Sequence, residues 1–133
     1  MTTENHDPGI ATVPSAGTVD ASLDRLESLA KTRGLTVFAR IDFSKDAAAS
    51  GMKLRTMQLL ILGNPKGGTP LMQAVSSTAL DLPLKVLAWE NDAGRCQLSF
   101  NRPEYLQQRH GFPTELLANI AGLAALVEAA AQG

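Results

Sequence analysis

The sequence predicts a two-layer α/β sandwich in which helices pack on one face of a mixed, mainly antiparallel sheet. Residues 35–43 alternate apolar and polar side chains, as in a strand with one buried face. Residues 18–33 carry apolar side chains at helical spacing, which is typical of a helix that packs on a core. Residues 84–101 hold two strand-like runs around Asn-Asp-Ala-Gly, which predicts a β-hairpin and so at least one antiparallel pair.

Length and composition favour one domain. The 133 residues are enough for a single core, and we expect a flexible tail at residues 1–8 before one domain at residues 9–133. Only 5% of the residues are aromatic, so aliphatic side chains must build the core. The 12 basic and 13 acidic side chains form no basic run, so we expect no nucleic-acid binding, which requires a clustered cationic face.

Cysteine and histidine are too scarce for a metal centre. Cys96 is the only cysteine, and its place in an alternating strand predicts a small buried side chain rather than a redox group. One of the two histidines, His6, falls in the predicted tail, so a zinc site is not expected, nor is any cofactor.

The polar, acidic N-terminus predicts no secretory signal, and no apolar run approaches the ~20 residues that span a bilayer. We therefore expect a soluble, cytoplasmic protein without membrane contact.

The first half of the chain predicts alternating strands and helices. A short strand is expected at residues 10–13, and a helix capped by Thr18 ends before Gly34. After the strand at residues 35–43, Ser44 is expected to cap a short helix. The strand at residues 57–62 is almost wholly apolar, which predicts cover on both faces or a subunit contact.

The second half predicts a helix after residue 69, the hairpin, a helical turn from Pro103 and a final helix capped by Thr114. The final helix carries one apolar stripe, made of Leu116, Ile120, Leu123 and Val127.

The segment between the apolar strand and the next helix reads G-N-P-K-G-G-T-P over residues 63–70. Thr69 and Pro70 are interpreted as the N-cap and first residue of that helix. A helix N-terminus beside the Lys66 ammonium predicts an anion site, with ligand-binding candidates Asn64, Lys66, Gly67, Gly68, Thr69 and the more distant Arg109. The alternative is a connection that needs these residues for its geometry alone. The segment matches neither the phosphate-binding G-x-x-x-x-G-K-[ST] nor G-x-G-x-x-G.

Acid–base candidates are few. His110 is a possible acid or base beside the anion clamp Arg109, or it contacts the carbonyls that end its own helix. Asp42 is a second acid–base candidate, or the partner of Arg40 and Lys45 in a surface ion pair. Ser76-Ser77-Thr78 lacks the G-x-S-x-G pattern of a nucleophile elbow.

Four segments together resemble the domain-of-unknown-function 302 family of small bacterial and archaeal proteins. They are G-L-T-V-F-A-R-I-D at residues 34–42, residues 51–70, L-D-L-P-L-K-V-L-A-W-E at residues 80–90 and N-R-P-E-Y-L-Q-Q-R-H-G at residues 101–111. The resemblance implies a two-layer α/β fold that is often dimeric, with no established activity. Family members commonly carry histidine where this chain has Phe43 and proline where it has Thr56.

Three functions therefore compete. The first is a non-enzymatic small-ligand or anion-binding module that acts as a homodimer. The second is an enzyme on a small anionic substrate, with His110 or Asp42 as acid or base. The third is a structural or interaction protein. Two surfaces could form the dimer: the alanine-rich reverse face of the final helix, or the sheet around residues 59–62 and Phe38.

Overall fold

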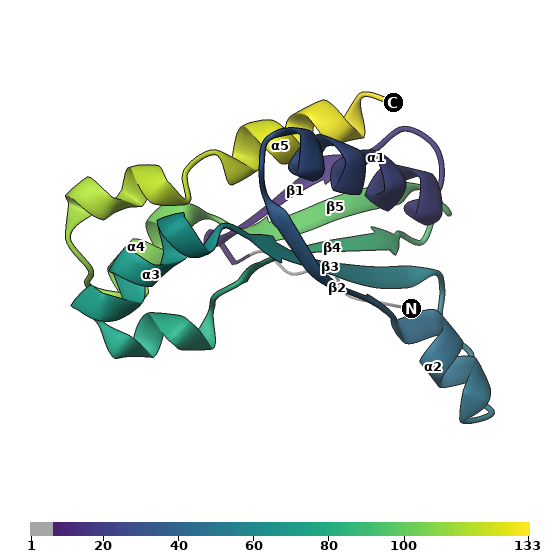
Figure 1. The fold of residues 1–133 in the computed structure, drawn as a ribbon. Coiled ribbons are helices and arrows are strands. Elements are labelled where there is room, and N and C mark those ends of the chain that lie inside the picture. Colours follow the sequence, from purple (N-terminus) through teal and green to yellow (C-terminus); the bar gives the residue numbers. More distant parts are fainter. Residues whose placement is uncertain (1–6) are drawn as a thin grey trace.

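The structure is a computed structural model that describes residues 7–133. It contains one five-stranded sheet of order β1-β5-β4-β3-β2, in which every pairing is antiparallel (Figure 1). The two-layer α/β class is thus confirmed, and no parallel pair occurs in the described sheet. His6 and the predicted tail, apart from Asp7 and Pro8, lie outside the described residues.

The strands alternate with helices as the sequence predicts. The strands are β1 Ile10–Pro14, β2 Thr36–Asp42, β3 Met57–Gly63, β4 Leu84–Glu90 and β5 Cys96–Asn101. The α-helices are α1 Val19–Thr32, α2 Phe43–Ala49, α3 Pro65–Ala74, α4 Pro103–His110 and α5 Leu123–Ala131. Two 3₁₀ helices, η1 Ser76–Leu80 and η2 Thr114–Asn119, complete the chain.

Helices α1 and α5 cover one face of the sheet, while α2, α3 and α4 lie beyond the strand ends (Figure 1). The main core forms between this face and the two helices, and Leu23, Leu60 and Leu98 within it are fully buried. Arg25 of α1 ties the two helices together, because its Nε donates to the Ala130 carbonyl at 2.8 Å. The other face of the sheet carries no helix in residues 7–133.

A second, smaller core lies beside the first, under α3, α4 and η2. It consists of Leu71, Leu106, Phe112 and Ile120, all nearly inaccessible to solvent. Gly111 ends α4 with a left-handed φ of 72°, which turns the chain so that Phe112 enters this core.

Several local predictions are confirmed. The β4–β5 hairpin forms, with Gly94 at a φ of 75° in its turn. Thr18 caps α1, since its hydroxyl accepts a hydrogen bond from the Ala21 amide at 3.0 Å. Pro103 is the first residue of α4.

Two helix starts were predicted wrongly, and in both the true cap is an earlier side chain. Asp42 rather than Ser44 caps α2, because its carboxylate accepts from the Lys45 amide at 2.9 Å. Asn64 rather than Thr69 caps α3, because its side-chain oxygen accepts from the Lys66 amide at 3.0 Å. Pro70 therefore lies inside α3.

The final helix is broken, contrary to the prediction of one helix capped by Thr114. Helix η2 is followed by a turn at residues 120–122 and then by α5. Ile120 belongs to the smaller core and Leu123 to the main core. The break therefore allows the apolar C-terminal segment to contribute side chains to both cores. For strand β3, one predicted alternative was that both of its faces are covered. In the structure, helices cover only one face of this strand.

By length and composition alone, the 18 residues Thr114–Ala131 could cross a membrane, and 28% of this segment is buried in the fold. The expectation that no apolar run approaches that length was therefore wrong.

Cys96 is 3% exposed and faces α1, as its position beside Leu98 and Phe100 predicts. Burial raises the pKa of its thiol, against the smaller opposing effect of a hydrogen bond with Ser22. Burial keeps reagents away from the thiol, and the raised pKa keeps it protonated, so both suppress its reaction.

We therefore expect Cys96 to be unreactive in the folded protein. A water-soluble disulfide reagent should label it fully in denaturant and leave it unlabelled over the same period in buffer. Absorbance of the released thiolate measures both reactions. Rapid labelling of the folded protein would contradict the buried position.

Candidate functional site

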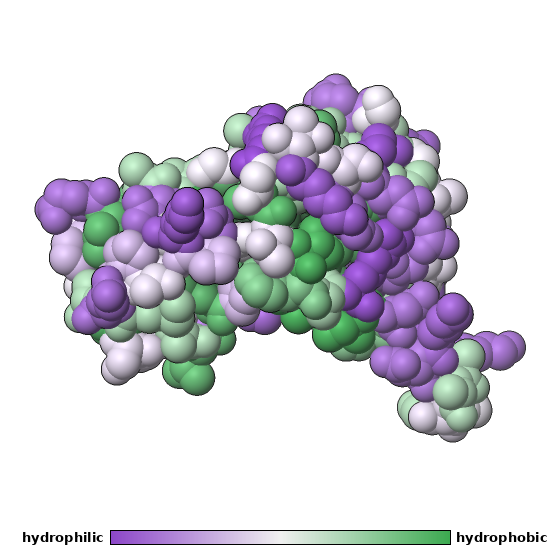
Figure 2. Space-filling model, viewed as in Figure 1, coloured by the Kyte–Doolittle hydropathy of each residue, from purple (hydrophilic) through white to green (hydrophobic). Residues whose placement is uncertain are grey.

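A cavity of about 400 Å³ opens where the two cores meet. It lies between α3, the ends of β2 and β3, the η1–β4 connection and the turn before α5. Hydrophobic residues gather at this junction on the surface, between the α3–α4 part and the sheet with α1 (Figure 2). The volume falls within the range of about 300–1,000 Å³ that is typical of small-molecule sites.

The cavity wall is mainly apolar, with a few polar side chains. Its apolar members are Leu35, Phe38, Leu62, Pro65, Met72, Ala79, Leu82, Pro83, Leu84, Ile120, Leu123 and Leu126. Its polar members are Arg33, Asn64, Thr69 and Asn119. A wall of this kind can take an apolar group and orient one polar group.

Two glycines and a β-bulge shape this space. Gly63 and Gly68 present no side chain, so Pro83 and Leu82 approach within 3.5 and 3.6 Å of where a Cβ would stand. The register of β2 shifts between Val37 and Ala39, which leaves Phe38 without a partner on β3. Phe38 is half exposed and lies at the cavity wall.

The structure divides the predicted ligand-binding residues between the cavity and other places. Asn64, Gly68 and Thr69 line the cavity. Lys66 and Arg109 are exposed and do not line it, and Gly67 packs against Asn119 instead.

The glycine segment is helical rather than a loop, so its amides are already used. The Gly67 and Gly68 amides both donate to the Asn64 carbonyl, at 2.9 and 2.8 Å, and the Lys66 amide donates to the Asn64 side chain. The first turn of α3 therefore offers none of these three amides to an anion. A ligand role for the segment now depends on its cavity-facing side chains.

Arg33 is the charged residue of the cavity wall, and the sequence interpretation missed it. It directly follows α1, is exposed, and its guanidinium has no hydrogen bond or ion pair within residues 7–133. In the sequence it is a basic residue near a helix C-terminus, a pattern that surface helices share. Only the fold shows that it faces an apolar cavity.

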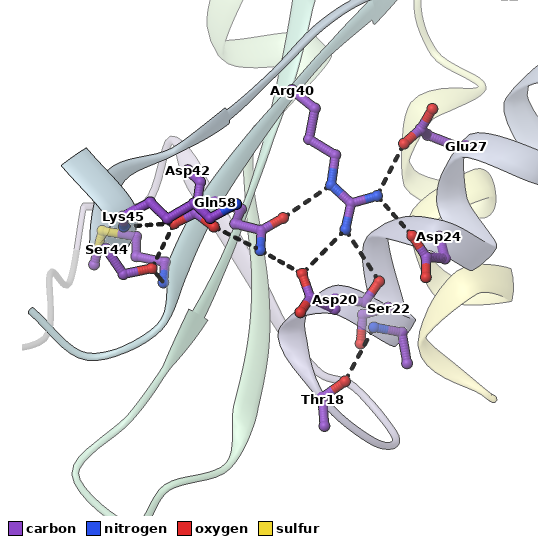
Figure 3. Close-up of polar contacts among 12 residues, drawn as sticks. Thr18, Asp20, Ser22, Asp24, Glu27, Arg40, Asp42, Ser44, Lys45 and Gln58 are labelled. Atoms are coloured by element: carbon purple, nitrogen blue, oxygen red, sulfur yellow. Dashed lines mark hydrogen bonds and ion pairs between the residues drawn. The ribbon is translucent and has the colours of Figure 1, made fainter. Parts of the chain in front are cut away.

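A separate polar network lies over the helix-covered face of β2 and β3 (Figure 3). The Arg40 guanidinium meets Asp24 at 2.7 Å and Glu27 at 2.9 Å, and its Nε donates to the buried Gln58 at 2.8 Å. Burial opposes the charge of Arg40, but the hydrogen bonds that its guanidinium donates to Asp24 and Glu27 outweigh this effect and raise the pKa of Arg40. With every partner paired, this network anchors α1 to the sheet.

Asp42 belongs to the same network rather than to a surface ion pair with Arg40. It accepts hydrogen bonds from the Ser44 hydroxyl and the Lys45 amide, and these lower its pKa. It also accepts from Gln58 at 3.3 Å. A carboxylate held ionised in this way caps α2 and is a poor proton donor.

His110 is brought together with two residues that the sequence interpretation did not pair with it. Its Nε2 lies 2.5 Å from Asp81 Oδ2, and its Nδ1 lies 2.8 Å from the Ser77 hydroxyl. Arg109 also pairs with Asp81, at 3.1 Å. His110 therefore does not contact helix carbonyls, and it does not converge with Asp42 or Lys66 on the cavity.

Residues 7–133 contain no group of three or more His, Cys, Asp or Glu side chains placed to hold a metal ion.

Fold and cavity define a small two-layer α/β domain with a space of ligand size between two cores. The chain belongs to the family described as “Domain of unknown function DUF302”, whose model matches residues 11–130. A crystal structure of an uncharacterized conserved protein DUF302 from Bacillus stearothermophilus has the same fold, with a TM-score of 0.78 at 18% identity. The match covers 93% of this chain and 96% of that one.

Two relatives carry the name “Fluoride-specific ion channel FluC 1”, from Brucella suis and Brucella abortus. Each is 41% identical to this chain over 104 residues, which is 78% of the chain. The matched part is only 41% and 38% of those proteins, so the chain spans about two fifths of their length.

The two glycines of α3 should respond differently to alanine. At Gly68 a Cβ makes ordinary contact with Leu82, so Gly68→Ala should raise the free energy of unfolding by about 0.5–1 kcal/mol through helix propensity. At Gly67 a Cβ would stand 3.0 Å from the Asn119 carbonyl oxygen, so Gly67→Ala should bring no gain or a loss. Urea denaturation of both variants measures the difference. Equal stabilisation by both would contradict the close contact between α3 and η2.

Proposed function

We propose that the cavity between the two cores is a non-enzymatic binding site for a small amphipathic anion. The observation that carries the proposal is an apolar space of about 400 Å³ with the Arg33 guanidinium, which has no partner among residues 7–133, at its wall. The apolar body of the ligand lies against Leu62, Leu84 and Leu126. Its anionic group meets Arg33, while Asn64 and Thr69 offer further polar contacts.

The wall chemistry favours an anion with an apolar body over a small inorganic one. We include fluoride in the test because the names of the Brucella relatives contain it. A small, strongly hydrated ion gains little from an apolar wall and loses its water there, which costs free energy. An alkyl chain gains free energy from the same wall in proportion to its buried area.

Calorimetric titration with octanoate, octanol and fluoride tests the proposal. We expect octanoate to bind and fluoride alone not to bind. Arg33→Ala should weaken octanoate binding by about 10-fold or more, the effect of losing one charge-assisted hydrogen bond, and leave octanol binding unchanged.

The place of binding is tested by filling the cavity. Gly68→Leu adds an apolar side chain to the wall and should abolish octanoate binding. Ala74→Leu makes a similar addition at an exposed position of α3 outside the wall and should leave binding intact. Binding of octanoate that survives Gly68→Leu would refute the cavity as its site.

We propose further that the module acts as a homodimer through the uncovered face of its sheet. Cross-strand partners share a face, and the pairs Met57–Trp89, Leu59–Leu87, Ile41–Leu59 and Ala39–Ile61 put apolar side chains side by side on it. All of these residues are half-buried without a covering helix. A contiguous apolar face of this kind favours a partner, and a second copy brings the same face by two-fold symmetry.

Sedimentation equilibrium tests the dimer and its surface. The wild-type protein should have about twice the 14.1 kDa chain mass, and Leu87→Lys should reduce it to that of one chain. Ala125→Lys, on the exposed side of α5, is the matched control and should stay dimeric. A wild-type protein of 14.1 kDa at high concentration would refute the dimer. Dissociation by Ala125→Lys alone would assign the contact to the helix face instead.

A further inference from the structure

Outside the cavity, one cluster combines a buried histidine with a carboxylate and an exposed hydroxyl. The His110 side chain is 2% exposed and that of Asp81 is 14% exposed, while Ser77 is exposed. The hydroxyl lies 2.8 Å from His110 Nδ1, and His110 Nε2 lies 2.5 Å from Asp81 Oδ2. The three side chains come from η1, the residue after it and the end of α4.

The chemistry of the three groups sets the direction of the hydrogen bonds. An ionised carboxylate only accepts, so His110 Nε2 carries a proton and donates it to Asp81. In the neutral imidazole Nδ1 is then unprotonated and accepts from the Ser77 hydroxyl. Asp81 thus holds the tautomer in which the imidazole can take a proton from Ser77.

We propose that Ser77 is an activated nucleophile, with His110 as its general base and Asp81 as the positioning residue. The cluster reproduces the roles of a serine–histidine–aspartate triad, which is recognised by geometry rather than by sequence order. The ring nitrogens are exchanged relative to the usual arrangement, and each still makes one bond to serine or carboxylate. This site is separate from the cavity and independent of the function proposed for it.

The substrate class is a small activated ester with an apolar group. In a 3₁₀ helix the side chains at i and i+3 are eclipsed, so Leu80 lies on the same side of η1 as Ser77. Leu80 is 73% exposed and offers an apolar contact beside the hydroxyl. The leaving group of an activated ester departs without assistance from a general acid. Such a substrate therefore suits a site made of a nucleophile and its base.

Each bond change in the reaction is balanced. Ser77 Oγ forms a bond to the acyl carbon while its proton passes to His110 Nδ1. The bond from the acyl carbon to the leaving oxygen breaks, and the proton goes to that oxygen. Water then attacks the acyl-serine, its proton passes through Nδ1 back to Ser77 Oγ, and the carboxylic acid is released.

A fluorophosphonate probe tests the nucleophile directly. Attack by Ser77 forms the Oγ–P bond and expels fluoride, and peptide mass spectrometry locates the adduct. We expect labelling at Ser77, loss of labelling in Ser77→Ala, and wild-type labelling in Ser76→Ala. Ser76 is the matched control, because it is the exposed neighbour with no bond to His110.

The base is tested separately from the fold. His110→Ala should slow labelling on the order of 100-fold, the usual size of a general-base contribution, and added imidazole should restore part of the rate. Asp81→Asn should slow labelling too, whereas Arg109→Ala, which removes the other partner of Asp81, should change it little. Circular dichroism checks that each variant is folded.

An unlabelled wild-type protein overturns the proposal, as does equal labelling of Ser76 and Ser77. A folded His110→Ala variant that keeps the wild-type rate also overturns it. If that variant does not fold, the Ser77→Ala and Ser76→Ala pair decides the question alone.

Discussion

The structure depends on the fact that α1 and α5 cover only one face of a five-stranded antiparallel sheet. Alternation along each strand divides the apolar side chains between the two faces, and the helices bury those on one of them. Leu60 and Leu98 on the covered face are fully buried, whereas Leu59 and Leu87 on the other face are half-buried. The sheet therefore leaves an apolar surface that favours a second copy of the chain.

The same one-sided cover explains why the cavity lies at the end of the sheet. Helix α5 begins only after the turn at residues 120–122, where the chain passes from the smaller core to the main core. Asn119 connects η2 to α3, since its side chain donates a hydrogen bond to the Gly67 carbonyl at 3.0 Å. The cavity lies between the two cores, and Gly63 and Gly68 add no side chain to its wall.

Polar side chains hold the remaining parts in place without leaving a buried group unpaired in the described residues. Arg40 binds α1 to β2 through the carboxylates of Asp20, Asp24 and Glu27, and Gln58 extends the network to Asp42 (Figure 3). Burying such groups is favourable only when each finds its partner, so the network fixes how α1 lies over the sheet. The cluster of Ser77, Asp81 and His110 joins η1 to α4 in the same way.

The sequence by itself determined the elements whose signal is local. Strand alternation, the Asn-Asp-Ala-Gly turn and the Thr18 cap each depend on neighbouring residues, and all three are present in the structure. Tertiary structure decided the features that depend on distant residues. The break before α5, Arg33 at the cavity and Ser77 beside His110 all depend on contacts between separate segments. Residues 33 apart in the chain, such as Ser77 and His110, share no local pattern, so only packing could bring them together.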